Sequence, residues 1–373
     1  MPKGTVVTYA SRLGKPLRAH QRIMLVADAK AIAGLTYYEF GGEYGAANDH
    51  SRSHHIYFVP DDTLLLDEAE SLGIRGATDL YGGVVPHPFV KTKAITHPLV
   101  DKDADRPSGW LFRFGERIRN AVLPGYTAFC CRDARIAAGR MLFRGPIRVK
   151  DPCEAGGRGQ TVITAPNELE ELLDHFPADN LANYGVVLEE NLHEVTTLSV
   201  GHITFNDLSF TYWGRQRVTT NNEKRLVYGG SDLVCVRGGW DALHQLPMPH
   251  AVRVGVEKAR VYDEATNAYP GFMASRRNYD VGLGLDVNGQ LESGVFESSW
   301  RVGGATGAEV AALAEFMRDS SVKVVEASHV EEFGRDSEPP PEAITSIRLD
   351  DPQDGPMIRY TIVRRTERTK RRV

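Results

Sequence analysis

A lysine followed by a glycine-rich segment is the clearest chemical feature of the chain. Three glycines within four residues remove side chains from this segment, so its backbone N–H groups can approach a phosphate closely. The lysine adds a positive charge that suits a polyphosphate, and an arginine between the glycines could reach the same anion. The residues are Lys150, then Gly156, Gly157, Arg158 and Gly159. The pattern predicts a site for a nucleotide.

The flanking residues indicate what kind of phosphate loop this is. The Walker A pattern G-x-x-x-x-G-K-[ST] does not occur here, and no helix opens after the glycines as the dinucleotide fingerprint requires. Residues 161–163 (Thr-Val-Ile) follow instead, and all three residue types favour strands. The segment therefore resembles a lid between two strands. The alternative is an ordinary glycine-rich hairpin turn.

Asp280 and Glu297 form a second candidate site. Residues 286–289 (Asp-Val-Asn-Gly) are a hairpin turn signal that separates the strands carrying these two acids. Folding the hairpin brings the carboxylates close together, and Mg²⁺ takes one or two such ligands beside phosphate oxygens. The alternative is a surface hairpin with two solvated acids.

A predicted helix follows the second site. Residues 306–309 (Thr-Gly-Ala-Glu) form a capping box, which marks a helix start. The positive end of the helix dipole would then lie near Arg301 and the glycines at 303 and 304. We expect the helix to turn Val310, Leu313 and Met317 inward.

The composition narrows the class of protein. With 373 residues, 42% apolar and 25% charged, the chain is expected to form two or three compact soluble units. It has no apolar run of about 18 residues to span a membrane, and its N-terminus lacks the order of a signal peptide. The four cysteines, at 130, 131, 153 and 235, follow no metal-ligand spacing, which indicates free thiols in the cytoplasm.

Charge and symmetry bear on possible partners. The net charge of −5 argues against a nucleic-acid binder, and the basic run over 364–372 is expected to be a solvated chain end. An RNA arm is the alternative for this run. A homodimer is expected only because symmetric dimers are common.

The elements that must position these residues can be predicted in outline. A strand over 56–59, a helix over 63–72 ending at Gly73, and a turn, short strand and stop over 82–86 predict a small parallel sheet. The glycine-rich residues 40–45 are expected to be a loop, and the polar residues 101–108 a linker or an exposed insertion.

The second half is predicted to be rich in strands. Asn167 is expected to cap a helix with Leu169, Leu172, Leu173 and Phe176 on one face. A strand over 185–190 ends in two carboxylates. Residues 198–236 are mostly strand-like, with a polar turn at 219–224.

Together these features resemble the ATP-grasp superfamily over roughly residues 110–320. In that family a strand lysine, a glycine-rich lid and an acidic hinge strand hold ATP, and a late Asp with an E-x-N-x-R motif binds metal and phosphates. Residues 228–233 and 297–304 look more closely like a bacterial ATP-grasp group described only as a domain of unknown function. The resemblance implies nucleotide contacts at Lys93, Lys150, Gly156, Gly157, Arg158, Gly159, Glu189, Glu190 and Leu192, with metal ligands Asp280, Glu297 and Ser299 and the closing Arg301.

The chain departs from the family pattern at three places. Ser299 replaces the metal-binding asparagine, and a hydroxyl offers a single oxygen. The acid expected to hold the ribose falls on Thr196 or Thr197, and the nearest acid is Glu194. Lys93 best matches the upstream lysine of the family, with Lys91 as the other choice.

The resemblance also implies a fold and a reaction. The fold is α/β (α+β), with a Rossmann-like pre-ATP-grasp domain over 1–105, two ATP-grasp lobes over 106–190 and 191–335, and a C-terminal extension with a basic tail over 336–373. The reaction uses Mg²⁺ and ATP to turn a carboxylate into an acyl phosphate that an amine displaces, with Arg158 and Arg301 as catalytic residues. The alternative is a decayed, ATP-binding regulatory or scaffold protein.

Overall fold

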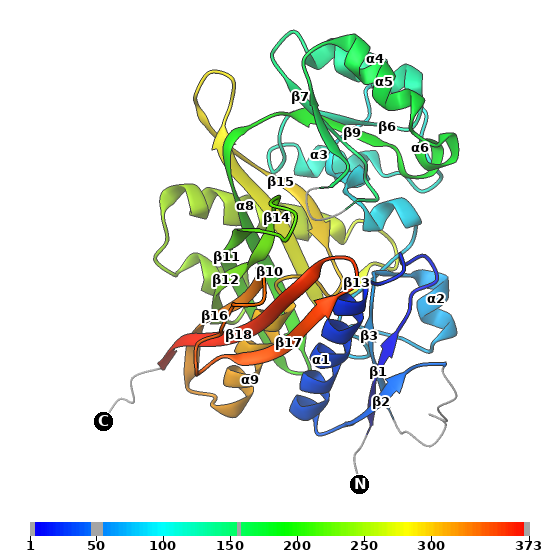
Figure 1. Ribbon diagram of the computed structural model, residues 1–373. Coiled ribbons are helices and arrows are strands. Elements are labelled where there is room, and N and C mark those ends of the chain that lie inside the picture. Colours follow the sequence, from blue (N-terminus) through cyan, green and yellow to red (C-terminus); the bar gives the residue numbers. More distant parts are fainter. Residues whose placement is uncertain (1–3, 46–54, 155–157, 369–373) are drawn as a thin grey trace.

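The N-terminal part of the chain forms a parallel sheet with a helix against it. The computed structural model describes residues 4–45, 55–154 and 158–368 (Figure 1). Strands β1 (Thr5–Tyr9), β2 (Glu39–Glu43) and β3 (Ile56–Pro60) pair in the order β2-β1-β3, and helix α1 (Ala19–Thr36) packs on β1. A parallel sheet is present as predicted, but of the two predicted strands only residues 56–59 belong to it. The predicted loop over 40–45 is wrong for most of its length, because pairing with β1 holds these glycine-rich residues extended.

A short segment links this sheet to the rest of the protein. Strand β5 (Gly83–Val85) pairs with β4 (Leu64–Leu65) on one side and with β13 (Met273–Ala274), from the second half, on the other. Helix α2 (Leu66–Ser71) is shorter than predicted because residues 64–65 join this sheet. Two 3₁₀ turns, η1 (Pro88–Lys91) and η2 (Lys93–Thr96), and helix α3 (Phe112–Ile118) follow.

The glycine-rich segment belongs to a four-stranded sheet. Strands β6 (Gly125–Ala128), β7 (Ile147–Lys150), β8 (Gln160–Ile163) and β9 (Val186–Glu190) pair antiparallel in the order β6-β9-β7-β8. Helices α4 (Cys131–Met141) and α5 (Pro166–Asp174) pack their apolar residues against this sheet, and α6 (Ala178–Tyr184) precedes β9. The predicted hairpin between two strands is confirmed, with Lys150 at the end of β7.

Helix α5 begins differently from the prediction. Its N-cap is Ala165 and Pro166 is its first residue, so Asn167 is not the cap. The Glu168 carboxylate accepts hydrogen bonds from the backbone N–H groups of Thr164 at 2.6 Å and Ala165 at 3.3 Å. This carboxylate therefore replaces the predicted asparagine cap. Leu169 and Leu173 are buried as expected.

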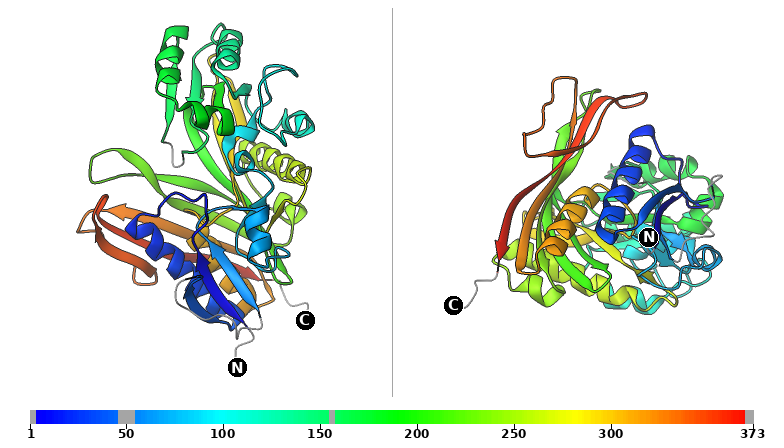
Figure 2. Two further views of the ribbon diagram at one scale, coloured as in Figure 1. Left: turned by 90° about the vertical axis from the view of Figure 1, so that its right-hand side faces the viewer. Right: turned by 90° about the horizontal axis from the view of Figure 1, so that it is seen from below.

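An eight-stranded sheet forms the centre of the molecule, in the order β15-β14-β10-β11-β12-β16-β18-β17. Figure 2 shows α1 and α9 together on one side of this curved sheet. Helix α8 packs its apolar residues on the opposite face of β10 and β14. The elements are β10 (His193–Phe205), β11 (Leu208–Thr220), β12 (Leu226–Arg237), α7 (Trp240–His244), α8 (His250–Thr266), β14 (Arg276–Leu285), β15 (Leu291–Ser299), α9 (Thr306–Arg318), β16 (Val322–Phe333), β17 (Ile344–Asp351) and β18 (Gly355–Arg368).

The last segment of the chain belongs to this large sheet. The residues expected as a C-terminal extension contribute β17 and β18, and β18 pairs along β16. The described part of the basic run lies in β18, where Arg365 pairs with Glu326 at 3.3 Å and Arg368 with Asp319 at 3.0 Å. Residues 364–368 are thus mostly exposed to solvent, as predicted, but they belong to a paired strand.

Helix α9 begins where predicted but by another means. Its N-cap is Ala305, without a side-chain hydrogen bond, so the predicted capping box is wrong. Glu309 is buried instead, where it accepts two hydrogen bonds from Arg276, at 2.8 and 2.9 Å, and one from Tyr81 at 2.9 Å. Val310 and Leu313 face inward as predicted, but Met317 is 40% exposed and Phe316 takes the inward place.

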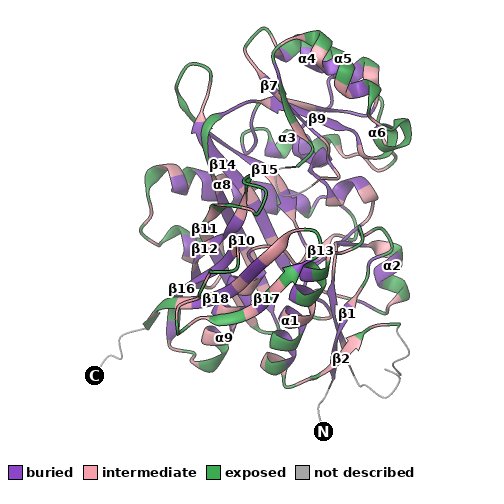
Figure 3. Ribbon diagram, in the orientation of Figure 1, coloured by how far each residue is buried: buried purple, intermediate pink, exposed green. Residues whose placement is uncertain are grey.

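Burial follows the layered arrangement. Figure 3 shows the buried residues concentrated along the strands, with exposed residues on the outer turns of the helices. All four cysteines are free thiols. Within the described ranges, every helix is too short or too polar to cross a membrane.

Candidate functional site

The two acids of the predicted metal site face each other across β14 and β15. Asp280 and Glu297 are register partners, as the turn signal at 286–289 predicted. Burial, followed by the Glu297 carboxylate, raises the pKa of Asp280 to about 7. Burial alone would raise the pKa of Glu297, but the Lys93 ammonium outweighs it and holds the pKa below its ordinary value. The pair thus combines one ionised carboxylate with one that is easily neutralised.

A β-bulge shapes this site. The register shifts by one residue after Asp280, so Phe296 is the extra residue of β15 and stands beside Glu297. A side chain at Gly282 would collide with the Phe296 ring, so the glycine leaves the space that the ring fills. The Lys150 ammonium lies 4.4 Å from the centre of this ring. The bulge therefore gives Lys150 an aromatic platform next to the acids.

Gly282→Ala is expected to disturb this arrangement. The added methyl group displaces the Phe296 ring, and overpacking of this kind costs about 1–3 kcal/mol of folding free energy. We expect a lower melting temperature and weaker ATP binding, measured by thermal unfolding and calorimetry. Gly139→Ala is the matched control, because a methyl group there meets open space in α4. Wild-type stability and ATP affinity in Gly282→Ala would contradict the proposed platform.

Lys150 is held by a buried acid. Its ammonium pairs with Glu189 on β9, and Glu189 also bonds His97 Nε2 at 3.1 Å. Burial lowers the pKa of Lys150, and the Glu189 carboxylate opposes that shift. Burial alone would raise the pKa of Glu189, but Lys150 and His97 together hold it below its ordinary value. Glu189 thus positions the lysine, and its carboxylate is not available to a nucleotide.

Lys93 is the second cation of the site. It is 3% exposed, pairs with Glu297 at 2.8 Å and donates to the Glu154 carbonyl at 2.8 Å. Lys91 pairs instead with Asp62 at 2.6 Å. The structure therefore places Lys93, and not Lys91, beside Glu297.

The described part of the lid contacts the segment between β1 and α1. Gly156 and Gly157 lie outside the described residues. Gly159 has a φ of 63°, which favours glycine, and its carbonyl accepts a hydrogen bond from the Asp151 N–H at 2.8 Å. Arg158 is exposed and lies 3.5 Å from Glu154, which also pairs with Lys15 at 2.6 Å. Arg158 thus reaches solvent at the edge of the site.

The hinge after β9 is partly buried. Glu190 is half-buried, Leu192 is buried, and the Asn191 side chain accepts a hydrogen bond from Arg148 at 2.7 Å. A bulge in β10 follows, with Glu194 exposed at a φ of 51°. The bulge shifts the register of β10 at the place where the family has its ribose-binding acid. Thr196, which comes after the bulge, is exposed.

Ser299 and Arg301 lie at the end of β15. Ser299 is two residues from Glu297 on the same strand, so the two side chains share a face. Its Oγ accepts a hydrogen bond from Arg276 at 3.4 Å. Arg301 is 36% exposed, and its Nε lies 3.8 Å from Asp62. Both residues border the acids, as the resemblance implied.

Other arginines that could face an acidic substrate are used elsewhere. Arg276 is buried against Glu309, and Arg277 pairs with Asp263 at 3.1 Å. Arg217 pairs with Asp232 at 2.8 Å, and Arg215 follows the same alternation on β11. Gln216 between them donates to Asp280 at 2.9 Å, so Arg215 and Arg217 face away from the acids.

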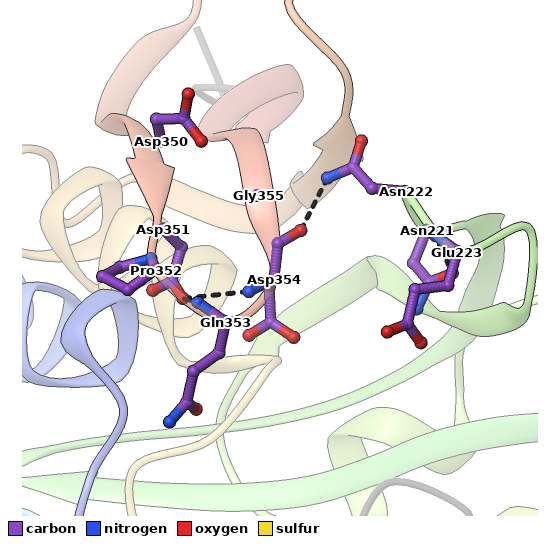
Figure 4. Close-up of a pocket in the computed structure, with 9 residues that line it drawn as sticks. All are labelled: Asn221, Asn222, Glu223, Asp350, Asp351, Pro352, Gln353, Asp354 and Gly355. Carbon is purple, nitrogen blue, oxygen red and sulfur yellow. Dashed lines mark hydrogen bonds between the residues drawn. The ribbon is translucent and has the colours of Figure 1, made fainter.

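A cavity of about 410 Å³ lies between the β11–β12 turn and the β17–β18 turn (Figure 4). Its carboxylates are engaged within the protein: Asp354 with Arg18 at 2.6 Å, and Asp351 with His20 at 3.0 Å. None of the predicted site residues lines it in the described part of the chain. This cavity is therefore separate from the lysine and carboxylate site.

Three contributors escaped sequence reasoning. His97 supports Glu189, Gln216 donates to Asp280, and Phe296 underlies Lys150. Neither His97 nor Gln216 stands in a recognisable motif. Phe296 precedes Glu297 directly, but only the bulge turns both toward the site.

A family model described as "Protein of unknown function (DUF3182)" matches residues 7–361. No curated protein sequence matches the chain. The family match agrees with the group that residues 228–233 and 297–304 resemble.

Solved structures share the fold over almost the whole chain. An N5-carboxyaminoimidazole ribonucleotide synthetase in its ADP complex has a TM-score of 0.52 and 11% identity, covering 98% of this chain and 93% of that one. The Staphylococcus aureus N5-carboxyaminoimidazole synthetase has a TM-score of 0.51 and 12% identity, covering 97% and 94%. The biotin carboxylase domain of the Hydrogenobacter thermophilus 2-oxoglutarate carboxylase, with MgADP, has a TM-score of 0.50 and 11% identity, covering 97% and 86%. These are ATP-grasp enzymes, and the predicted ATP-grasp fold is confirmed.

Proposed function

The chain belongs to the DUF3182 family, and we propose that it is an ATP-dependent ligase of the carboxylate–amine type. It would phosphorylate a substrate carboxylate with Mg-ATP and join the acyl phosphate to an amine, releasing ADP and phosphate. The observation that carries the proposal is the meeting of Lys150 and Lys93 with Asp280 and Glu297. Cations for a triphosphate and oxygens for a metal thus stand side by side.

The residues present suit both ligands. Lys150 and Lys93 are buried cations that would hold phosphate oxygens. Asp280, Glu297 and Ser299 offer the hard oxygen ligands that Mg²⁺ prefers. Mg²⁺ held by these residues would supply positive charge to offset the charge of the phosphates.

In the structure the two lysines of the site form ion pairs with protein carboxylates. Lys93 neutralises Glu297, and Glu189 neutralises Lys150. Binding of Mg-ATP would exchange the Lys93–Glu297 pair for one contact with phosphate and one with metal. Since both charges regain partners, the exchange avoids leaving a buried charge unpaired.

The reaction needs positioning more than covalent work by the protein. An oxygen of the substrate carboxylate attacks the terminal phosphorus, and the bond from that phosphorus to the ADP oxygen breaks. The amine nitrogen then attacks the acyl carbon, the carbon–oxygen bond to phosphate breaks, and the amine loses a proton. Arg301 and Arg158 would steady the transferred group, and the lid would exclude water from the acyl phosphate.

The substrates in this proposal are small molecules, a carboxylic acid and an amine. The four free thiols suit the cytoplasm. A homodimer remains the proposed assembly on general grounds alone.

A catalytically decayed ATP-binding protein is the second candidate. Ser299 in place of asparagine and the threonines at the ribose position favour it. Retention of both lysines, both acids and Arg301 favours the enzyme. Release of ADP with a suitable acid and amine distinguishes the two, since a scaffold binds ATP without consuming it.

Thermal unfolding with and without Mg-ATP tests the nucleotide site. A ligand at a hundred times its Kd stabilises a protein by about 2.7 kcal/mol, which raises Tm by a few degrees. We expect this rise with Mg-ATP and a smaller one with ATP and a chelator. An unchanged Tm at millimolar Mg-ATP would contradict the proposed site.

A further inference from the structure

A row of polar side chains begins at Asp280 and runs across the strands of the large sheet. In the register of the strands, Asp280 lies beside Ser199, Gln216 beside Ser231, Ser231 beside His329, and His329 beside Thr361. The Gln216 amide donates to Ser199 Oγ at 3.1 Å and to Asp280 at 2.9 Å, which links the first strands of the row. The row therefore connects the face of the proposed reaction with the sheet region under α1 and α9.

Three polar groups at the far end of this row lack partners. Asp28 Oδ2 on α1, His329 Nε2 on β16 and Arg359 Nε on β18 form no hydrogen bond with any described residue. Asp28 is 6% exposed and His329 is fully buried. The His329 Nε2 is 3.9 Å from Glu331, beyond hydrogen-bond distance. Buried polar atoms are normally paired with protein, water or a ligand, so three in one cluster mark a place for a water or a ligand.

The charges of this cluster do not balance. Arg276 is paired with Glu309, and Arg359 donates to Glu331 at 2.8 Å. Burial, followed by Arg359, lowers the pKa of His329 to about 3, so its ring is neutral. Among the described residues Asp28 forms no ion pair, although the charges of Arg276 and Arg359 act on it. A positively charged group would pair with the Asp28 carboxylate. An oxygen acceptor close to that group would pair with the free Nε–H of Arg359.

We propose that Asp28, His329 and Arg359 bind the amine substrate of the ligase, and that this substrate is an amino acid. Asp28 accepts the ammonium group and the Arg359 Nε–H donates to the carboxylate. His329 Nε2 faces the same ligand as a neutral polar contact. The assignment rests on the proposed ligase function, because it names the substrate that follows ATP.

The test uses the full chain with Mg²⁺ and a non-hydrolysable ATP analogue. Each common L-amino acid is added in turn at millimolar concentration, and binding is measured by thermal shift and then calorimetry. We expect at least one to bind, and its deaminated and decarboxylated analogues to bind at least about tenfold more weakly, as loss of one charged hydrogen bond implies. A nucleotide-loaded protein that binds none of them would overturn the assignment.

Two variants test separately the contacts with the ammonium group and with the carboxylate of the amino acid. Asp28→Asn should weaken amino-acid binding by about tenfold or more and leave nucleotide affinity unchanged. Arg359→Lys keeps the charge beside Glu331 but loses the Nε–H, so it should weaken the amino acid and not its decarboxylated analogue. Asp350→Asn is the matched control, since this exposed acid lines the neighbouring cavity and pairs with exposed Arg335 at 2.7 Å. Equal binding by Asp28→Asn and wild type would contradict the proposal.

The melting temperature of Asp28→Asn distinguishes a binding role of Asp28 from a structural role, because the two roles change it in opposite directions. Burial raises the pKa of Asp28 to about 7, followed by Glu309, while Arg276 and Arg359 oppose the shift. A carboxyl whose pKa is raised on folding destabilises the protein increasingly as pH rises from about 4 to 7. Asp28→Asn should therefore unfold at a higher temperature than wild type at pH 8. A lower melting temperature would assign Asp28 a structural role.

The outcomes also separate this assignment from the proposed function. If Mg-nucleotide fails to bind the wild type, the ligase proposal fails. If nucleotide binds and acid substrates release ADP with amines other than amino acids, only the identity of the amine is wrong.

Discussion

Glu297→Gln is expected to abolish magnesium-dependent ADP release and leave the protein folded. The amide retains an oxygen that can accept from Lys93, which is 2.8 Å from the carboxylate in the wild type. It loses the negative charge that Mg²⁺ requires beside Asp280. Groups that only hydrogen-bond to a metal ligand already account for about 10–100-fold in activity. Loss of the ligand itself should therefore lower activity by more than that. Turnover is measured as ADP release over a magnesium titration.

A control on the same strand separates chemistry from folding. Glu292→Gln makes the same substitution at an exposed position of β15. Its ADP release and Tm should equal those of the wild type. Full activity in Glu297→Gln would mean that the metal binds elsewhere, and a large fall in its Tm would mean that Glu297 has a structural role.

Lys150→Ala is expected to weaken ATP binding by about 30-fold or more, because truncating one partner of a buried charge pair costs about 2–5 kcal/mol. The structure adds a second effect, since Glu189 would stay buried with His97 alone. An uncompensated buried charge costs about 3–5 kcal/mol of folding free energy. Calorimetry for ATP and thermal unfolding measure the two effects.

The double variant Lys150→Ala/Glu189→Gln distinguishes these effects. Removing the orphaned carboxylate should restore much of the stability and none of the ATP affinity. Without Lys150, burial would raise the pKa of Glu189, so the single variant should gain stability as pH falls from 8 to 5. Wild-type ATP affinity in Lys150→Ala would remove the lysine from the proposed site.

Features governed by nearby residues were predictable from the sequence. The turn at 286–289 set the pairing of Asp280 with Glu297, and the residues around Lys150 indicated the β7–β8 hairpin. Lys93 was chosen through the family resemblance, and the structure brings it to Glu297. Such turns fix strand register over a few residues, so local patterns suffice.

Features that depend on distant partners were not predictable. Glu309 matched a capping box, yet Arg276, 33 residues away, draws it into the core. The Phe296 bulge depends on the pairing of whole strands, which no local pattern records. Residues 336–373 are predicted to be an extension, but β18 within them pairs with β16 and joins the sheet. Tertiary packing decided each of these cases.

The contact between Asp351 and the start of α1 has a consequence for how the protein is made. The Asp351 carboxylate accepts from the His20 N–H at 3.2 Å, across 331 positions of sequence. At a synthesis rate of ~5–20 residues per second, the nascent helix waits roughly 15–70 s for this acid to be added. The start of helix α1 is therefore completed only after β17 has been translated.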